Sequence, residues 1–238
     1  MNRIRHCRRI HTDVVFGVEN LTRVRDTIRL ILKVITVSKI VTSQLKQPRY
    51  LKKLTIRSGI LIPLCTVNGV PSLLYNLRSS KLRAHRGEVC FPGGRKDANE
   101  TVQQTALRES WEEIGLDPNA VDILGILPGA PDRTMKSLTV GVVGFLGELN
   151  ELELTINKDE VAHLFTVPIE TLLSDEVAKR QYFRVGNQPS KSDYEMPVYL
   201  TESHVGHRVW GFTAIQTNLT LSILLPDRVE LLIPRFIK

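Results

Sequence analysis

Cysteine is scarce in this chain of 238 residues. The three cysteines, Cys7, Cys65 and Cys90, are odd in number and lack the two-residue spacing of a metal knuckle. This pattern excludes a disulfide framework and a cysteine zinc site, and it suits a reducing compartment. Cys65 and Cys90 each lie in an apolar run, so we expect them to be small buried side chains rather than nucleophiles.

Long hydrophobic runs are also missing. The apolar segment 14–18 ends at Glu19, and the longer segment 30–41 contains Lys33 and Lys39. Both are too broken for a membrane span or a secretory signal. No internal repeat occurs, and the balance of 42% apolar and 24% charged residues excludes collagen-like, disordered and low-complexity classes.

Acidic residues are rare in the first 57 positions, which hold three acids against 14 Lys or Arg, a net charge of +11. Since the whole chain carries +7, the remaining residues carry −4, and no nucleic-acid partner is expected. An Arg-rich, acid-poor segment with Ser and Thr is typical of a mitochondrial transit peptide, which we expect over residues 1–50. The alternative is a basic, partly helical arm that stays attached.

From residue 58 onward, short apolar runs separated by turn residues predict strands. Segments 59–67 and 72–77 form a hairpin pattern joined by Asn68-Gly69, a dipeptide typical of type I′ turns. Segment 179–199 fits no pattern. The mixture of helices and strands favours an α/β or α+β domain with a mixed sheet, over residues 55–230. Further elements are expected as strands at 89–91, 123–127 and 139–146, the last broken by Gly141 and Gly144, and as a helix at 213–225.

One helix, at 101–115, has signals for both of its ends. Thr101 and Gln104 have the spacing of a capping box, and Gly115 is placed to end the helix in the left-handed conformation. An apolar stripe at helical spacing predicts the buried face, formed by Leu107, Trp111 and Ile114.

Three carboxylates, Glu109, Glu112 and Glu113, are expected on the opposite side of this helix. Each like-charged pair three or four residues apart costs ~0.2–0.5 kcal/mol. A hard divalent cation such as Mg²⁺ or Mn²⁺ would offset this repulsion, because it prefers oxygen ligands and substrate phosphates. A solvated acidic face is the alternative.

The spacing around these carboxylates is that of a known motif. Its positions are filled by Gly94, Glu100, Arg108, Glu109, Ser110, Glu112, Glu113, Gly115 and Leu116. The segment thereby resembles the Nudix box, a loop-helix-loop motif of hydrolases that cleave a nucleoside diphosphate linked to another moiety. Ser110 stands where the motif usually has an apolar or small residue.

The resemblance implies a Nudix α/β/α sandwich with a mixed sheet, and hydrolysis that depends on Mg²⁺ or Mn²⁺. It also implies that Arg108 pairs with Glu100 and so orients Glu109, and that a backbone carbonyl near Gly93 or Gly94 adds a metal ligand. Three carboxylates would hold the metal, principally Glu109 and Glu113, with Glu112 third, directly or through a water.

A second motif lies just upstream of the helix. Arg78-Ser79, Arg83, Gly87 and the segment 91–94 have the core spacing found in coenzyme A diphosphatases of the Nudix superfamily, which this region resembles. The chain departs from that motif at two points: Tyr75 stands where the motif has Thr, and one extra residue precedes the arginine. The resemblance implies hydrolysis of coenzyme A or acyl-coenzyme A to 3′,5′-ADP and 4′-phosphopantetheine or its acyl form.

Within this subfamily, segments 62–71, 73–80 and 208–214 resemble its mitochondrial members, so the likeness covers about residues 59–225. Together with the basic leader, it implies a location in the mitochondrial matrix. Arginines suit bidentate contacts to phosphate, so Arg78 and Arg83, together with Gly93 and Gly94, are the expected substrate-binding residues.

Several alternatives stay open. The chain could be a Nudix hydrolase of another small molecule, such as NADH or ADP-ribose, or a non-catalytic Nudix binding domain, although a domain that only binds has no need of three carboxylates. Glu160 is either the general base or a helix N-terminal charge. Trp210 is expected in the core. We assign no role to the histidines, and the oligomeric state stays open, with monomer as one option.

Overall fold

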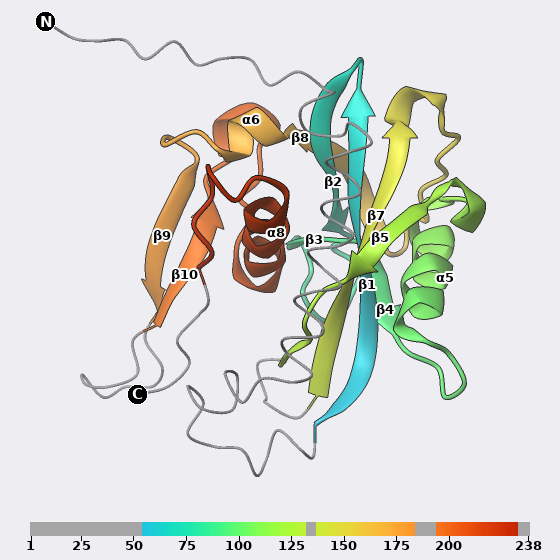
Figure 1. Cartoon of the computed structure of the whole chain (residues 1–238). Helices are drawn as coiled ribbons and strands as arrows, with labels where there is room; N and C mark the ends of the chain where they lie inside the picture. Colours follow the sequence, from blue (N-terminus) through green and yellow to red (C-terminus); the bar gives the residue numbers. More distant parts are fainter. Residues whose placement is uncertain (1–53, 132–136, 184–193, 233–238) are drawn as a thin grey trace, which may run out of the picture.

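A computed structural model describes residues 54–131, 137–183 and 194–232 (Figure 1). The expected leader, 1–50, lies outside these residues. The strands are β1 (Thr55–Val67), β2 (Val70–Arg78), β3 (Val89–Cys90), β4 (Gly93–Arg95), β5 (Asp122–Ile126), β6 (Ala130–Pro131), β7 (Ser137–Glu148), β8 (Val161–Pro168), β9 (Ala178–Phe183) and β10 (Tyr194–Tyr199). The helices are α5 (Val102–Ile114), α6 (Ile169–Leu172), α7 (Glu202–Val205) and α8 (Gly211–Leu224), with short 3₁₀ turns at Pro118–Ala120 and Leu149–Glu151.

Strand β1 lies at the centre of a mixed sheet built from β1 to β8. It pairs antiparallel with β2 and β4 and parallel with β7, and β2 in turn pairs with β3 and β8. The hairpin predicted from Asn68-Gly69 is confirmed, since both residues have positive φ and Leu64 faces Leu73 in register. Parallel strands such as β1 and β7 are normally buried on both faces, which explains the unbroken apolar run of β1.

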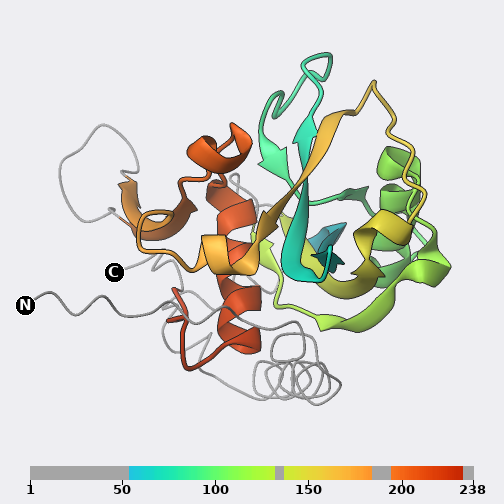
Figure 2. The same ribbon diagram turned by 90° about the horizontal axis from the view of Figure 1, so that it is seen from above.

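Helices cover both faces of this sheet. Helix α5 packs on one face against β1, β4 and β7, and α8 covers the other face (Figure 1). The predicted α/β sandwich with a mixed sheet is therefore confirmed. A separate hairpin of β9 and β10 lies on the outer side of α8 and adds a further layer (Figure 2). These two strands lie in the segment 179–199, which the sequence left unassigned and of which residues 184–193 lie outside the described part.

The expected break in β7 is wrong, because the strand runs unbroken through Gly141 and Gly144. A Cβ on Gly141 would lie 2.7 Å from Oε1 of Gln216 on α8, and one on Gly144 would lie 2.6 Å from a Val121 methyl. These glycines therefore allow the neighbouring layers to approach the sheet closely, and they do not end the strand.

Helix α5 begins and ends as predicted. The Thr101 hydroxyl accepts a hydrogen bond from the backbone N–H of Gln104, whose side chain accepts one from the Thr101 N–H, and Gly115 caps the helix with φ 68°. Helix α8 confirms the helix expected at 213–225.

The predicted apolar stripe of α5 is wrong at Trp111, which is 55% exposed, whereas Ile114 is fully buried as predicted. The buried side chains are mostly small: Thr105, Ala106, Ser110, Glu113 and Ile114. The physical reason is the short distance between α5 and β1, where a Cβ on Gly59 would lie only 2.6 Å from the carbonyl oxygen of Val102. An indole ring does not fit into such a narrow gap.

Two further expectations concern exposure. Trp210, expected in the core, is 42% exposed at the start of α8, which corrects that prediction. Cys65 is fully buried as predicted, and Cys90 is partly buried. Among the described residues, no helix combines the length and the apolar character that crossing a lipid bilayer requires.

Candidate active site

The chain between β3 and α5, here called the glycine loop, contains Gly93 and Gly94 in the short strand β4. This strand lies directly against the central strand β1. Gly93 has φ 149°, and a Cβ there would lie 2.5 Å from the Gly59 carbonyl oxygen, so only glycine fits. The Gly93 N–H donates a hydrogen bond to Oε2 of Glu113 (3.1 Å). The loop therefore places a backbone donor directly on a carboxylate of α5.

Glu113 and Glu109 are carboxylates held out of water. The Glu113 side chain is 2% exposed, and burial is the main reason why its pKa is raised to about 7. The charges of Glu160 and Glu109 raise this pKa further, whereas the Gly93 N–H and the charge of Arg78 lower it. Burial also raises the pKa of Glu109, which Arg108 partly offsets. Charge on this pair is disfavoured unless a cation is close by.

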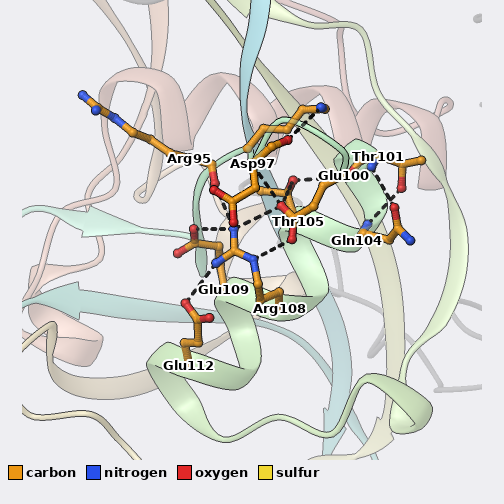
Figure 3. A network of polar contacts seen from close by, with 10 residues as sticks. Arg95, Asp97, Glu100, Thr101, Gln104, Thr105, Arg108, Glu109 and Glu112 are labelled. Atoms are coloured by element: carbon orange, nitrogen blue, oxygen red, sulfur yellow. Dashed lines mark hydrogen bonds and ion pairs between the residues drawn. The ribbon is translucent and has the colours of Figure 1, made fainter.

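Arg108 joins the carboxylates around it (Figure 3). Its Nε donates to Oε1 of Glu100 (2.7 Å), and its Nη2 lies 3.0 Å from Oε1 of Glu109 and donates to the Arg95 carbonyl (2.9 Å). The predicted contact between Arg108 and Glu100 is thus present. The hydrogen bonds from Arg108 lower the pKa of Glu100 to about 2. The Glu100 carboxylate accepts hydrogen bonds from both Nε and Nη2 of Arg108 and so holds the guanidinium in one orientation. The guanidinium in turn fixes Glu109.

Glu112 differs from the other two helix carboxylates. Its side chain is 51% exposed, and its Oε2 accepts a hydrogen bond from Nη1 of Arg108 (3.0 Å). The three carboxylates therefore do not form one uniform face. Glu113 points toward the sheet, where it meets Asn76 of β2, and the Glu109 side chain is 15% exposed. Figure 3 shows Glu109 and Glu112 on either side of Arg108, and Glu112 lies at the exposed rim.

The loop before β8 brings Glu160 to the same place. Its charge is near enough to raise the pKa of both Glu109 and Glu113. Asn157 connects this loop to α5: its N–H donates to the Glu113 carbonyl (2.9 Å), and its Nδ2 donates to Oε1 of Glu160 (3.3 Å). Glu160 does not begin a helix, because β8 follows it at Val161–Pro168, so the alternative of a helix N-terminal charge is wrong.

The two expected phosphate-binding arginines lie in different surroundings. Arg78, at the end of β2, places Nη1 3.9 Å from Oε1 of Glu113, and its Nε is buried without a hydrogen-bond partner among the described residues. Arg83 is exposed in the loop that follows. Only Arg78 is therefore brought together with the carboxylates, and an unpaired buried N–H beside them is suited to an anionic ligand.

Two asparagines were missed by the sequence interpretation. Asn76 is fully buried, and its Nδ2 donates to Oε2 of Glu113 (3.2 Å). The alternation of side chains along a strand could have found it, since Asn76 and Arg78 must share one face of β2. Asn157 reaches Glu113 and Glu160 only through the path of the loop before β8, and no local pattern in the sequence reveals that path.

The donor set fits a hard divalent cation. A Cβ on Gly94 would lie 2.4 Å from Oε2 of Glu109, so the glycine leaves the space that this carboxylate occupies beside the loop. Neighbouring carboxylates with raised pKa values are stabilised by an oxygen-preferring cation rather than a soft one. Among the described residues, no group of three or more Asp, Glu, His or Cys side chains is arranged to hold a metal ion, so substrate or water oxygens would have to supply the remaining ligands of a cation bound by two carboxylates.

Comparison with known proteins agrees with this fold and site. The NUDIX domain profile matches residues 57–185. The chain is 39% identical to Nudix hydrolase 3 of Caenorhabditis elegans over 194 residues, which are 76% of this chain and 80% of that protein. It is 42% identical over 171 residues to the mouse protein named mitochondrial coenzyme A diphosphatase NUDT8 (71% of this chain, 78% of that one). It is 33% identical over 182 residues to the mouse protein named peroxisomal coenzyme A diphosphatase NUDT7 (74% of each).

This chain belongs to the Nudix hydrolase family. It is a Nudix diphosphatase acting on a small molecule, in a family whose members generally use divalent metal ions.

Proposed function

We propose that this chain hydrolyses the diphosphate bond of coenzyme A and acyl-coenzyme A, giving 3′,5′-ADP and 4′-phosphopantetheine or its acyl form. The observation that carries the proposal is the 42% identity, over 71% of the chain, to a protein named a mitochondrial coenzyme A diphosphatase. The same likeness, together with the basic N-terminal segment of 57 residues, supports a location in the mitochondrial matrix. The domain boundaries 55–230 belong to the same proposal.

The metal site of the proposed reaction is formed by Glu109 and Glu113, with Glu112 as a third ligand. Glu112 pairs with Arg108 at the exposed rim, so a water between it and the cation suits its position better than direct contact. Bound there, Mg²⁺ or Mn²⁺ would neutralise charge on the diphosphate and lower the pKa of a water molecule. The backbone of Gly93 and Gly94 lies beside these carboxylates, so the carbonyl groups of the two glycines are candidate additional ligands.

The protein's own side chains orient the reactants. Arg108, clamped by Glu100, fixes Glu109. Arg78 presents an unpaired buried N–H that could donate to a phosphate oxygen, and the exposed Arg83 is the candidate contact for an outlying phosphate of the substrate. Glu160 is the candidate general base, because it is a half-buried carboxylate next to Glu109 and Glu113 and is held by the Asn157 amide.

The test is chromatography of the products after the purified full chain is incubated with coenzyme A and either Mg²⁺ or Mn²⁺. Metal-dependent formation of 3′,5′-ADP supports the proposal. NADH and ADP-ribose serve as competing substrates, and turnover of these alone would keep the Nudix chemistry but reject coenzyme A. If nothing is turned over, the non-catalytic binding domain becomes the better explanation.

Glu113→Gln is the matched site variant for this assay. It removes one charge and keeps the shape, so we expect turnover to be lost while the melting temperature stays close to that of the wild type. Glu112→Gln changes the neighbouring exposed carboxylate, and we expect a smaller loss. If Glu113→Gln retained most of the rate, the metal site would be wrongly placed.

A further inference from the structure

We infer that Asn76 is a positioning residue that decides which oxygen of Glu113 is available to a cation; the inference rests on the proposed function. Asn76 is fully buried on β2 and lies between two partners. Its Nδ2 donates to Oε2 of Glu113 (3.2 Å), and its Oδ1 accepts a hydrogen bond from the Cys90 thiol (3.2 Å).

The two partners fix the direction of the Asn76 amide. Glu113 must be ionised to bind a cation, and an ionised carboxylate only accepts hydrogen bonds, so in that form the amide nitrogen must face Glu113. The Cys90 thiol can then donate to the amide oxygen on the other side. Turning the amide over would place its oxygen against the Glu113 carboxylate, and the buried groups would repel each other. Cys90 thus orients Asn76, and Asn76 orients Glu113.

The consequence is an asymmetry between the two oxygens of Glu113. Oε2 accepts hydrogen bonds from both Asn76 and the Gly93 N–H (3.1 Å). Within the part of the chain that the structure describes, Oε1 has no such donor, and it lies 3.9 Å from Nη1 of Arg78, at the end of β2 where the phosphate is expected. With Oε2 held by two donors, Oε1 is the oxygen left free to bind a cation.

The same strand supplies a matched control. Tyr75, the neighbour of Asn76, points to the opposite face of the sheet, where its hydroxyl is hydrogen-bonded to Thr217 of α8 (3.0 Å). Tyr75→Phe therefore removes one buried hydrogen bond from β2 without touching Glu113. Any effect of Asn76 variants that exceeds the effect of Tyr75→Phe reports on Glu113 rather than on the stability of the strand.

The experiment measures Mn²⁺ binding by the full chain without substrate, from the electron paramagnetic resonance signal of free Mn²⁺. Asn76→Leu, which has a similar volume but no donor, should raise the Kd for Mn²⁺ about tenfold, which corresponds to about 1.4 kcal/mol, because a hydrogen bond to the charged form of Glu113 is lost. Tyr75→Phe should stay within twofold of the wild type. Cys90→Ser, which keeps a donor, should also stay within twofold.

Kinetics give a second readout. With coenzyme A as substrate, the Mn²⁺ concentration for half-maximal rate should rise in Asn76→Leu by the same factor as the Kd, and kcat at saturating Mn²⁺ should recover most of its wild-type value. A residue important only for folding would lower the amount of active enzyme and leave the metal dependence unchanged. Asn76→Ala decides the question if the leucine variant does not fold.

The inference is overturned if a folded Asn76 variant binds Mn²⁺ within twofold of the wild type, or if the wild type binds no Mn²⁺. Failure of the proposed function looks different. A wild-type chain that binds Mn²⁺ but does not hydrolyse coenzyme A refutes the substrate, while the binding comparison between Asn76→Leu and Tyr75→Phe still tests Asn76.

Discussion

Helices α5 and α8 cover opposite faces of one sheet, and they are held in place differently. Helix α5 has a capping box at its start and a left-handed glycine at its end, both of which are local interactions. Helix α8 has no side-chain cap at Trp210, and most of its side chains are buried between the sheet and the β9–β10 hairpin. Its position therefore depends on contacts with distant parts of the chain.

The polar groups of the two helices also differ in their partners. Helix α5 directs charged groups, Arg108 and three carboxylates, toward a glycine loop and solvent. Helix α8 buries neutral polar groups, several of which donate to its own backbone, as Thr217 does to the Thr213 carbonyl. The difference indicates that the face of the sheet covered by α5 carries the catalytic groups, whereas the face covered by α8 contributes to the stability of the core.

The largest effect is expected from Gly94→Ala on the α5 side. The new Cβ would lie 2.4 Å from Oε2 of Glu109, and a flexible side chain can move away from it without unfolding the protein. Misplacing a reacting group by about 1 Å costs about 100-fold in rate, so activity should fall by that order while the melting temperature changes little. Rate and thermal unfolding measured on the same sample check this. A large loss of stability with normal specific activity would contradict it.

The next effect is expected from Thr217→Val on the α8 side. This change removes the hydrogen bond to the buried Tyr75 hydroxyl, and an unsatisfied buried group costs about 1–3 kcal/mol. Urea unfolding should show this loss, with kcat unchanged in the folded protein. The double variant Tyr75→Phe with Thr217→Val should regain part of the stability. A fall in kcat would show that the α8 face contributes to the chemistry.

A smaller effect is expected from Thr101→Ala, which removes the N-cap of α5. Loss of such a cap costs about 1 kcal/mol. The free energy of unfolding should fall by this amount in Thr101→Ala and stay nearly unchanged in Thr101→Ser, which keeps the hydroxyl. Equal losses in both variants would show that the cap hydrogen bond is not what stabilises the start of α5.

The smallest effect is expected from Trp111→Ala. The indole is 55% exposed on the outer side of α5, and surface substitutions usually change stability by less than about 0.5 kcal/mol. Urea unfolding and the rate with coenzyme A should both match the wild type. A destabilisation of several kcal/mol would restore the apolar stripe that the helical spacing predicted.

The sequence by itself determined the features that depend on neighbouring residues. The hairpin turn at Asn68-Gly69 and both ends of α5 follow from backbone conformations and caps within a few positions. The contact between Arg108 and Glu100 was implied in the same way by a motif of fixed spacing. Such features depend little on the rest of the fold, because the residues that form them are close together in the sequence.

Tertiary structure alone decided which face of α5 is buried. The close approach of α5 to Gly59 on β1 leaves no room for an indole ring, so Trp111 is turned outward, while Glu113 is turned inward, against the prediction for these two residues. It also decided which donors meet Glu113, because Asn76 and Gly93 come from other elements. Periodicity along a helix gives the relative directions of its side chains. The distance to the neighbouring layer decides which of those directions is the inside, and that distance is set by residues far away in the sequence.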